Sequence, residues 1–583
     1  EHLLFLCHNE TEYFQFARFE DPKGNSKLSK LQMFGWGPND DIRTLCEHNL
    51  KHLIYEENLT DGLGSLTGEL VAAKIASAFD ISKVSYLFYS DYKKEFERAK
   101  ITIKENTLIE EEGDLHNATQ TIFNRMLFLR FIEKKGWLKL TNSEDEDYLK
   151  QLYRMGGIGS SDFYSSRLRP MFFKGLAVKG RQKDDAYGTV PYLNGGLFEE
   201  TELDKKIPSL PDDFFKPLIG NRGLFYRYNF TVQESTPLDI NVAIDPEMIG
   251  TMFEQLVTDR DEKGAFYTPR NVVSYMCREA IKSLIEDKTD IDSEKIRILV
   301  DDNEDPNFSL IEAKKINTAL FELKAIDPAC GSGAYLLGLL YELVRIHGIL
   351  STTHDDLKIS VFKLKRQIIA NSIYGVDIDP FATNIAMLRL WLSLSVEAPE
   401  PVPLPNLDFK IRTGDSILAP NPSQPNSRLD VTGALEKARQ LEKLAMEKYV
   451  RSSGENTRKL RTKINEGFAE ARKSLRGEEE EIGSVDFGVE FIGVFDNGGF
   501  DIVLTNPPYV RQEDIGKSFK RKILTNYTSE EDPPVEGKSD LYCYFYARAN
   551  QLLRPGGIQV FICSNSWLDV GFGKTLQNYL LNL

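Results

Sequence analysis

The chain has 583 residues, of which 41% are hydrophobic and 27% are charged, proportions that are ordinary for a soluble globular protein. This length exceeds what a single hydrophobic core supports, so we expect two to four domains. The first residue is Glu1 rather than Met, so we also expect either a fragment of a longer protein or a chain with a disordered start. The formal net charge of −16 opposes nucleic-acid binding over the surface as a whole, since phosphate repels an acidic chain, but it does not exclude a local basic face.

Two further classes of protein are disfavoured by the sequence. No apolar run is long enough to span a bilayer and no signal segment opens the chain, so we expect no association with a membrane. Six cysteines without a Cys-x-x-Cys pair predict reduced thiols and a cytoplasmic location. Cys46, His48 and His52 lie close together, but a fourth ligand and a second pair are missing, so we predict no metal site.

The first half of the chain divides into two parts by its patterns. Residues 1–114 mix short β-type runs, Leu3–Leu6 and Val84–Phe88, with a helical stretch at 68–77, which predicts a small α/β unit. Residues 115–239 are predicted to form a mostly helical domain with long loops, because apolar residues recur there at three- and four-residue spacing before a stretch rich in Gly, Pro and aromatics.

From residue 240 to 583, helix-like segments alternate with short β runs. This alternation predicts a parallel sheet covered by helices on both faces, an α/β fold in which ligands bind at the carboxyl ends of the strands. The alternation is interrupted at about 425–485, where Ala, Glu, Lys, Arg and Leu predict an inserted helical hairpin with solvated faces. The β runs lie at 323–327, 373–377, 409–413, 501–505 and 558–564.

A glycine-rich loop follows the first of these strands and leads into an apolar helix. In Ala325–Gly333, the residues Gly331 and Gly333 remove side chains where the backbone turns sharply and a ligand comes close. Such a loop also fits a dinucleotide binder. A third glycine at dinucleotide-type spacing is missing, however, and so is the Lys-Ser or Lys-Thr pair of a triphosphate site.

Carboxylates end the next two strands. Asp377 is placed to accept hydrogen bonds from both hydroxyls of a ribose, while Asp379 is expected to cap the following helix. Asp415 ends the third strand and is placed to accept from the amino group of an adenine in a cofactor. Any one of these carboxylates could equally be a helix cap, but acidic loops at successive strand ends favour a shared ligand site.

The strand Phe500–Thr505 ends abruptly at Asn506-Pro507-Pro508-Tyr509. An asparagine held at a strand tip can accept hydrogen bonds from a planar amino group, while the ring that bears this group stacks on the tyrosine. The alternative reading is an ordinary strand-terminating turn, because Asn and Pro are both common in turns.

One more turn precedes the sheet region, at Gly264–Arg270. Thr268 is expected to be the N-cap of a helix and Pro269 its first residue. The same turn could close over part of a cofactor.

In this order, these segments resemble those of S-adenosylmethionine-dependent N6-adenine DNA methyltransferases with gamma-class motif order. The resemblance covers roughly residues 240–583 and implies a Rossmann-like class I methyltransferase sheet, with S-adenosylmethionine as cofactor. It implies the following roles: Tyr267, Thr268 and Pro269 hold the methionine moiety; Asp327, Ala329, Gly331 and Gly333 form the cofactor loop; Asp377 and Ile378 bind the ribose; Asp415 and Ser416 bind the adenine; and Asn506, Pro507, Pro508 and Tyr509 are catalytic.

Further segments extend this resemblance. Lys538–Phe545 and Gly556–Trp567 match later core segments of the family. The region 115–140 and Pro191–Phe198 resemble the domain before the core in type IIG fused restriction-modification enzymes and phage-defence methyltransferases. The implied partners are double-stranded DNA, with its target adenine flipped out, and additional restriction or defence subunits. The recognition domain of the family lies beyond the point where this sequence ends.

Other functions stay open at this point. Residues 1–114 could be the remainder of a nuclease domain in a fusion that acts mainly in restriction. Release-factor glutamine methyltransferases also contain Asn-Pro-Pro-Tyr, so methylation of RNA or of a protein glutamine is an alternative. A scaffold that binds DNA or a partner without catalysis is another.

Overall fold

The structure is a computed structural model, and it describes most of the chain in separate stretches. These are 2–8, 13–20, 30–36, 42, 45–46, 49–54, 68–140, 147–155, 162–193, 196–198, 200–232, 239–241, 243–250, 268–398, 400–402, 405, 407–422, 433–445, 456–476, 485–527 and 535–582.

The chain forms two compact units, which we describe separately. Unit 1 comprises Glu1–Met252 with Ala398–Pro403, and unit 2 comprises Phe253–Glu397 with Leu404–Leu583. The division into three parts at 114 and 239 stays a prediction. Within unit 1 the helices on either side of residue 114 pack against each other.

Unit 1 contains a four-stranded sheet of order β1-β2-β3-β6, in which β6 runs parallel to β3 and the other pairs are antiparallel. Aromatic residues stabilise it: Phe16 packs on Phe34, and Phe34 packs on Phe79 with ring centroids 4.7 Å apart. The strands are β1 (His2–His8), β2 (Tyr13–Glu20), β3 (Lys30–Trp36) and β6 (Asp239–Asn241).

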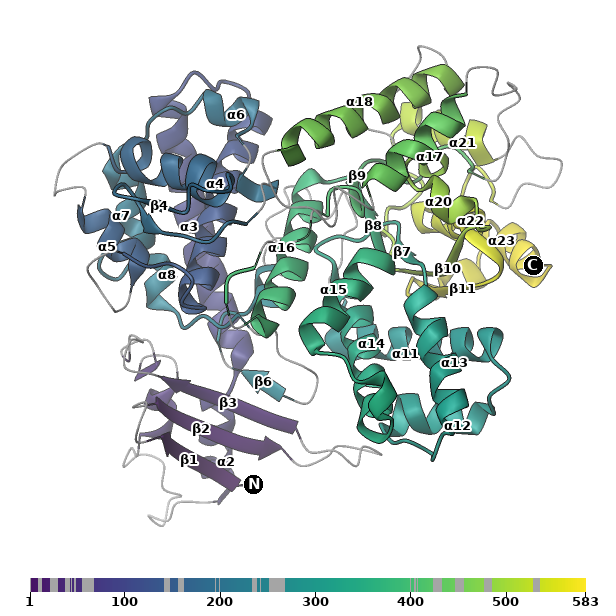
Figure 1. The fold of residues 1–583 in the computed structure, drawn as a ribbon, viewed down its shortest axis with the longest axis horizontal. Coiled ribbons are helices and arrows are strands. Elements are labelled where there is room, and N and C mark those ends of the chain that lie inside the picture. The colour runs from purple at the N-terminus through teal and green to yellow at the C-terminus, as the bar shows by residue number, and fades with distance from the viewer. Residues whose placement is uncertain are drawn as a thin grey trace. The chain divides into compact units, whose positions relative to one another are not determined.

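The rest of unit 1 is helical (Figure 1). A two-stranded sheet of β4 (Lys183–Asp184) and β5 (Gly188–Thr189) lies among these helices. The helices are α2 (Gly68–Ala78), α3 (Ile81–Asn106), α4 (Glu112–Lys134), α5 (Tyr148–Met155), α6 (Glu202–Lys205), α7 (Asp212–Ile219) and α8 (Leu224–Arg227), with the short turns η1 (Leu50–Leu53), η3 (Tyr164–Leu168), η4 (Met171–Leu176) and η5 (Gly196–Phe198).

One strand prediction in unit 1 is wrong. Val84–Phe88 lies inside helix α3, where Val84, Phe88, Tyr92 and Phe96 are buried at four-residue spacing. The longer helical period therefore overrides the β-type composition of a five-residue run. The helix expected after residue 115 is confirmed as α4, whose residues are buried on nearly all sides.

Burial of α4 brings an arginine into the core of unit 1. Arg125 is almost fully buried and forms a two-point ion pair with Asp204, with nitrogen–oxygen distances of 2.5 and 2.9 Å. Its Nε atom also donates to the Leu197 carbonyl oxygen. Because every polar group of this pair has a partner, the charge is tolerated inside the core.

Unit 2 is built on a five-stranded, entirely parallel sheet of order β11-β10-β7-β8-β9, which confirms the α/β fold class. The five strands correspond to the five β runs expected from the sequence. They are β7 (Ala325–Asp327), β8 (Ile373–Asp377), β9 (Ile411–Thr413), β10 (Phe500–Thr505) and β11 (Leu553–Phe561).

Helices cover both faces of this sheet (Figure 1). They are α11 (Arg270–Lys288), α12 (Ser293–Arg297), α13 (Leu310–Glu322), α14 (Ala334–Thr353), α15 (Val361–Asn371), α16 (Pro380–Glu397), α17 (Ala434–Leu444), α18 (Asn456–Arg476), α19 (Phe487–Glu490), α20 (Ile492–Phe495), α21 (Lys517–Tyr527), α22 (Leu541–Leu552) and α23 (Gly573–Leu581), with the short turns η6 (Ile298–Asp302), η7 (Asp355–Leu357) and η9 (Asn565–Leu568).

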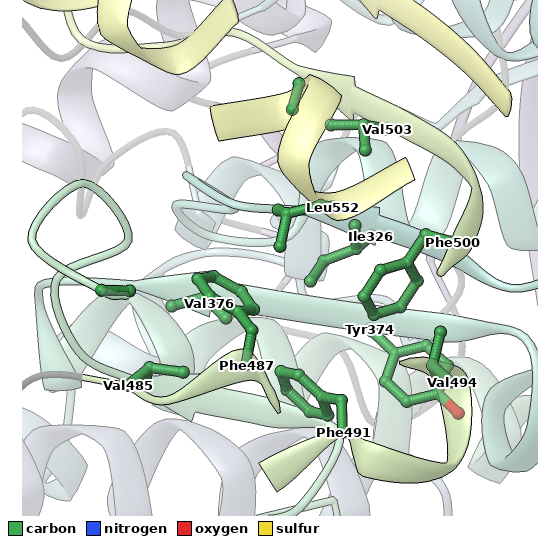
Figure 2. Close-up of a cluster of buried hydrophobic side chains, with 12 residues drawn as sticks. Ile326, Tyr374, Val376, Val485, Phe487, Phe491, Val494, Phe500, Val503 and Leu552 are labelled. Atoms are coloured by element: carbon green, nitrogen blue, oxygen red, sulfur yellow. The ribbon is translucent and has the colours of Figure 1, made fainter. Parts of the chain in front are cut away.

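Strand β8 shows how the two faces are separated. Tyr374 and Val376 point into an apolar cluster made with α19, α20 and α22, in which the Tyr374 ring lies edge-on to Phe491 (Figure 2). Gly375, between them, faces the other side, where an added Cβ would lie 3.0 Å from Leu336 of α14. This alternation explains why the strand sequence is apolar throughout.

The inserted region contains α17 and α18, which pack against each other through Ala438, Leu441 and Phe468. At Gly467 the two helices approach closely, since an added Cβ would lie 2.4 Å from a Leu441 methyl carbon. The prediction of helices in this region is therefore confirmed.

The expectation that no apolar run is long enough to span a bilayer is wrong for helix α14. By length and composition alone it could cross a membrane, and 56% of the relevant window is buried in the structure. It packs against α11, α15 and the strands β7 and β8. These contacts are those of a core helix in an α/β unit, where a helix buried on most sides is apolar all round.

Candidate functional site

A pocket of about 380 Å³ lies where the loops after β7, β8, β9 and β10 meet, at the carboxyl end of the sheet of unit 2. The sequence placed candidate residues on these four loops, and the pocket is lined by all four. Ten of the fifteen candidate positions line it: Thr268, Asp327, Ala329, Gly331, Asp377, Ile378, Asp415, Ser416, Asn506 and Pro508. Tyr509 lines the adjoining pocket described below.

The loop after β7 is held by its own aspartate and by two glycines. Asp327 is 1% exposed, and its Oδ1 atom accepts a hydrogen bond from the Ala329 N–H at 3.0 Å. Burial raises the pKa of Asp327 to about 7. Gly331 and Gly333 have φ values of +51° and +84°, and a Cβ on Gly333 would lie 2.9 Å from Ala386. Both positions thus require glycine, as expected.

Asp377 joins the first two loops. Its Oδ2 atom accepts from the Gly331 N–H at 2.8 Å, and its Oδ1 atom accepts from the Asp379 N–H at 2.9 Å. A carboxylate offers about four acceptor sites, so Asp377 can accept from a ligand beside these backbone groups. Asp379 accepts in turn from the Phe381 N–H in the first turn of α16, the capping role expected for it. Ile378 is 67% exposed at the pocket.

The loop after β9 is also fixed by its own side chains. Oδ1 of Asp415 accepts from the N–H groups of Ile417 and Leu418 at 2.8 and 2.9 Å, and burial raises the pKa of this carboxyl group. The Ser416 hydroxyl donates to the Pro328 carbonyl oxygen at 2.6 Å. Ser416 therefore ties the β9 loop to the β7 loop, and Asp415 keeps its other oxygen for a different donor.

Asn506 connects the loop after β10 to the segment before α11. Its Nδ2 atom donates to the Thr268 hydroxyl oxygen at 2.9 Å, across 238 residues of sequence. The expected helix cap at Thr268 is therefore wrong. Helix α11 begins at Arg270 with Pro269 in the N-cap position and no side-chain cap, because the Thr268 hydroxyl binds Asn506 instead.

Besides Tyr509, four candidate residues are not among those that line the 380 Å³ pocket. Pro507 is buried behind the loop, and Gly333 precedes α14 in the wall. Pro269 lies beside Thr268 at the start of α11. Tyr267, with the rest of 264–267, lies outside the described residues.

A second pocket, of about 1040 Å³, adjoins the first. Val510 lines both pockets, and Tyr509 lines the second, where its hydroxyl donates to the Ile562 carbonyl oxygen at 3.1 Å. Tyr542 stands beside it, with ring centroids 6.2 Å apart. Polar side chains complete the wall, among them Ser564 and Ser566.

Sequence reasoning missed the apolar wall of the first pocket. Tyr335, Phe519, Leu541 and Phe545 line it. Leu541 and Phe545 fall in the segment that resembles a later core segment of the family, so a signal for them existed. Phe519 is on α21 and Tyr335 is on α14, where an aromatic residue is indistinguishable by pattern from ordinary core.

The two pockets can hold two planar groups at neighbouring strand ends. The first offers buried carboxylates, the Asn506 amide and an apolar wall. The second offers the Tyr509 ring, three residues after Asn506 in the sequence. Among the described residues, no group of three or more His, Cys, Asp or Glu side chains could hold a metal ion. His48, one of the three residues weighed as ligands, lies outside them.

Comparison with known proteins shows what unit 2 is similar to. Residues 371–583 match the family model of the Eco57I restriction-modification methylase, and residues 303–397 match that of the MmeI DNA-methyltransferase domain. These matches support the resemblance to restriction-modification DNA methyltransferases that was inferred from the motifs. Residues 87–218, in unit 1, match a domain of unknown function.

Particular relatives agree with this class. The chain is 31% identical over 331 residues to a putative type II restriction enzyme and methyltransferase of Methanocaldococcus jannaschii, covering 51% of this chain and 27% of the relative. It is 20% identical over 503 residues to the type II restriction enzyme and methyltransferase RM.Eco57I of Escherichia coli, covering 80% of this chain and 38% of the relative. The chain thus spans well under half the length of either relative.

One further relative and one solved structure are also similar. An adenine-specific methyltransferase, PglX, of Streptomyces coelicolor is 45% identical over 69 residues, or 12% of this chain and 5% of that protein. A structure of the type IIL restriction-modification enzyme MmeI with DNA covers 85% of this chain and 52% of that one, at 16% identity and a TM-score of 0.49.

Proposed function

We propose that this protein transfers a methyl group from S-adenosylmethionine to the N6 amino group of a flipped adenine in double-stranded DNA, in the cytoplasm, as part of a restriction-modification or phage-defence system. The observation that supports this most is the meeting of Asn506 with Asp327, Asp377 and Asp415 around one pocket. A second pocket with a tyrosine at its wall opens beside it.

The residues of the first pocket suit the parts of this cofactor. The Oδ2 atom of Asp327 is buried and accepts no hydrogen bond from the residues that the structure describes, so it can receive an ammonium group. Asp377 can accept from the ribose hydroxyls on the lone pairs that its two backbone contacts leave. Phe519 and Phe545 supply apolar surface for a purine ring.

Asn506 and Pro507 would act on the target base. The adenine amino nitrogen is a weak nucleophile because its lone pair is delocalised into the ring. Hydrogen bonds from its two N–H groups to the Asn506 amide oxygen and the Pro507 carbonyl oxygen would favour a pyramidal nitrogen. Thr268 fixes the orientation of the amide by accepting from its nitrogen, so the oxygen is presented as the acceptor. Positioning and fixed dipoles would then supply most of the catalysis.

Tyr509 would hold the extruded base. A base inside a duplex cannot reach either pocket, and flipping it out costs a few kcal/mol. Stacking on an aromatic ring returns about 1–3 kcal/mol. The Tyr509 ring is held by its hydroxyl bond to Ile562 and lines the second pocket beside Val510, which lines both. Bound S-adenosylmethionine supplies an electrophilic methyl group.

The test is to sequence modified bases in DNA from cells that carry the full-length protein or its Asn506→Ala variant. We expect N6-methyladenine at a fixed sequence with the natural protein and none with the variant. Methylation found only on RNA or on a protein glutamine, or equal DNA methylation by the two proteins, would contradict the proposal.

A further inference from the structure

Two cations stand in the wall of the larger pocket. Arg511 and Lys538 line this pocket and are exposed. Neither side chain forms an ion pair with the residues that the structure describes. Elsewhere in unit 2 exposed cations commonly do, as Lys295 does with Glu312 and Lys315 with Asp290, at 2.8 and 2.6 Å.

The carboxylates of the same wall are engaged by neighbouring groups of the protein. Asp540 accepts from the Gln512 N–H at 2.9 Å, and Glu536 accepts from the Thr575 hydroxyl at 2.6 Å. Glu513 accepts from the Gln512 side chain at 2.8 Å. These bonds hold the carboxylates to the loops of the wall. Arg511 attracts Glu513 and Asp540 through its charge but forms no ion pair with them, so its guanidinium and the Lys538 ammonium can receive an external anion.

The segment after the Asn-Pro-Pro-Tyr loop is basic in an acidic chain. Residues 511–522 contain five Lys or Arg and two Asp or Glu, whereas the whole chain has a net charge of −16. Lys517, Arg521 and Lys522 are exposed on α21, which begins six residues after Arg511. A local excess of positive charge thus adjoins the pocket that contains Tyr509.

We propose that Arg511 and Lys538 bind the phosphates that flank the flipped nucleotide, and that the exposed cations of α21 continue this contact along the DNA backbone. This inference rests on the proposed function. A flipped nucleotide rotates about its own backbone, so its two flanking phosphates come to the rim of the pocket that holds the base. Backbone phosphates are the anions that Arg and Lys contact most in DNA complexes.

The experiment measures duplex binding by the full-length protein as a function of salt concentration. Each lost phosphate contact lowers the slope of log affinity against log salt by about 0.9. The double variant Arg511→Gln, Lys538→Gln should therefore lower the slope by about 1.8 and weaken binding to all sequences alike. The double variant Arg511→Lys, Lys538→Gln keeps one of the two charges, so it should lower the slope by only about 0.9.

A matched control is Lys363→Gln, which removes an exposed lysine of α15 that lines neither pocket. It should leave the slope unchanged, and S-adenosylmethionine affinity by calorimetry should be the same in all variants. An unchanged slope in the double variant, an equal change in the Lys363 control, or duplex binding that does not depend on salt would overturn the inference. Failure of the proposed function is distinguishable: the slope would change as expected, but no adenine would be methylated.

Discussion

At the scale of single residues, a variant of Asn506 tests the catalytic step apart from cofactor binding. Asn506 lines the first pocket, and its amide nitrogen donates to Thr268 within the protein. Asn506→Ala should lower the methylation rate by about 100-fold or more, the usual effect of removing one group that stabilises a transition state. Cofactor affinity, measured by calorimetry, should change less than about threefold, because the carboxylates of the pocket remain.

Thr268→Val provides the matched control for this variant. It keeps the shape of the side chain and removes the oxygen that orients the amide, so we expect a smaller loss of rate than for Asn506→Ala. A rate for Asn506→Ala close to that of the natural protein would show that the amide has no catalytic role.

Asp377 tests the ribose assignment. Asp377→Ala removes the acceptor for the ribose hydroxyls and also the bonds to the Gly331 and Asp379 N–H groups, so cofactor affinity should fall at least about tenfold. Asp292→Ala is the control, because Asp292 caps α12 by accepting from two N–H groups outside the pocket. That change should cost about 1 kcal/mol of stability and leave cofactor affinity unchanged. Equal affinities for the two variants would exclude Asp377 from the site.

Asp327 predicts a pH dependence of cofactor binding. Burial raises its pKa to about 7, so in the empty pocket the carboxyl group is mostly protonated at pH 6 and mostly ionised at pH 8. The contact requires an ionised carboxylate and a charged ammonium group, whose own pKa is about 7.8, hence the affinity should fall about fourfold between pH 8 and pH 6. Asp327→Asn should bind weakly at both pH values, with a flat profile. A natural protein whose affinity does not change over this range would contradict the role.

At the scale of elements, the sequence predicted the parallel strands well because their residues are apolar on both faces. Tyr374 and Val376 show this on β8, and so does the continuous apolar run of β10. Val84–Phe88 was misassigned because five residues cannot distinguish a strand from a buried helix face. Thr268 was misassigned because its partner, Asn506, is 238 residues away, and a local pattern cannot contain that contact. Phe519 and Tyr335 gave no signal for the same reason.

The attachment of the inserted hairpin to the sheet domain can be tested through Glu442. This α17 residue is buried and accepts a hydrogen bond from the Gly493 N–H. Burial raises its pKa to about 7 from 4.5, so the folded state binds the proton more tightly than the unfolded state does. The protonated Glu442 carboxyl group therefore contributes its full share of the folding stability below about pH 4.5, and this contribution is lost as the pH rises through 7.

Glu442→Gln should therefore raise the free energy of unfolding at pH 8 by on the order of 1–3 kcal/mol, and leave it nearly unchanged at pH 5. Denaturant unfolding at the two pH values measures this difference. Glu436→Gln, an exposed change on the same helix, should have no effect at either pH. A loss of stability for Glu442→Gln at pH 8 would show that the carboxylate is ionised and paired in the folded protein.

At the scale of the whole molecule, net charge and local charge point in opposite directions. A chain of net charge −16 is repelled by DNA at long range, so the proposed binding depends on a small basic surface around Arg511 and α21. Composition averages over the surface, which is why it opposed a nucleic-acid partner while the motifs favoured one. The motifs were informative because they lie on strand ends that the parallel sheet brings together.

The division into two units predicts where a bound cofactor stabilises the protein. Every residue that lines the first pocket belongs to unit 2. At a concentration 100 times its dissociation constant, S-adenosylmethionine should stabilise the unit that binds it by about 2.7 kcal/mol. Hydrogen exchange resolved by peptide should then slow around β7, β8 and β9 and stay unchanged in α4 of unit 1, which serves as the internal control. Asp377→Ala, which lowers the affinity at least about tenfold, should reduce this stabilisation to about 1.4 kcal/mol or less at the same cofactor concentration. Protection in α4 equal to that in β7–β9, or undiminished protection in the variant, would show that the cofactor acts elsewhere than in this pocket.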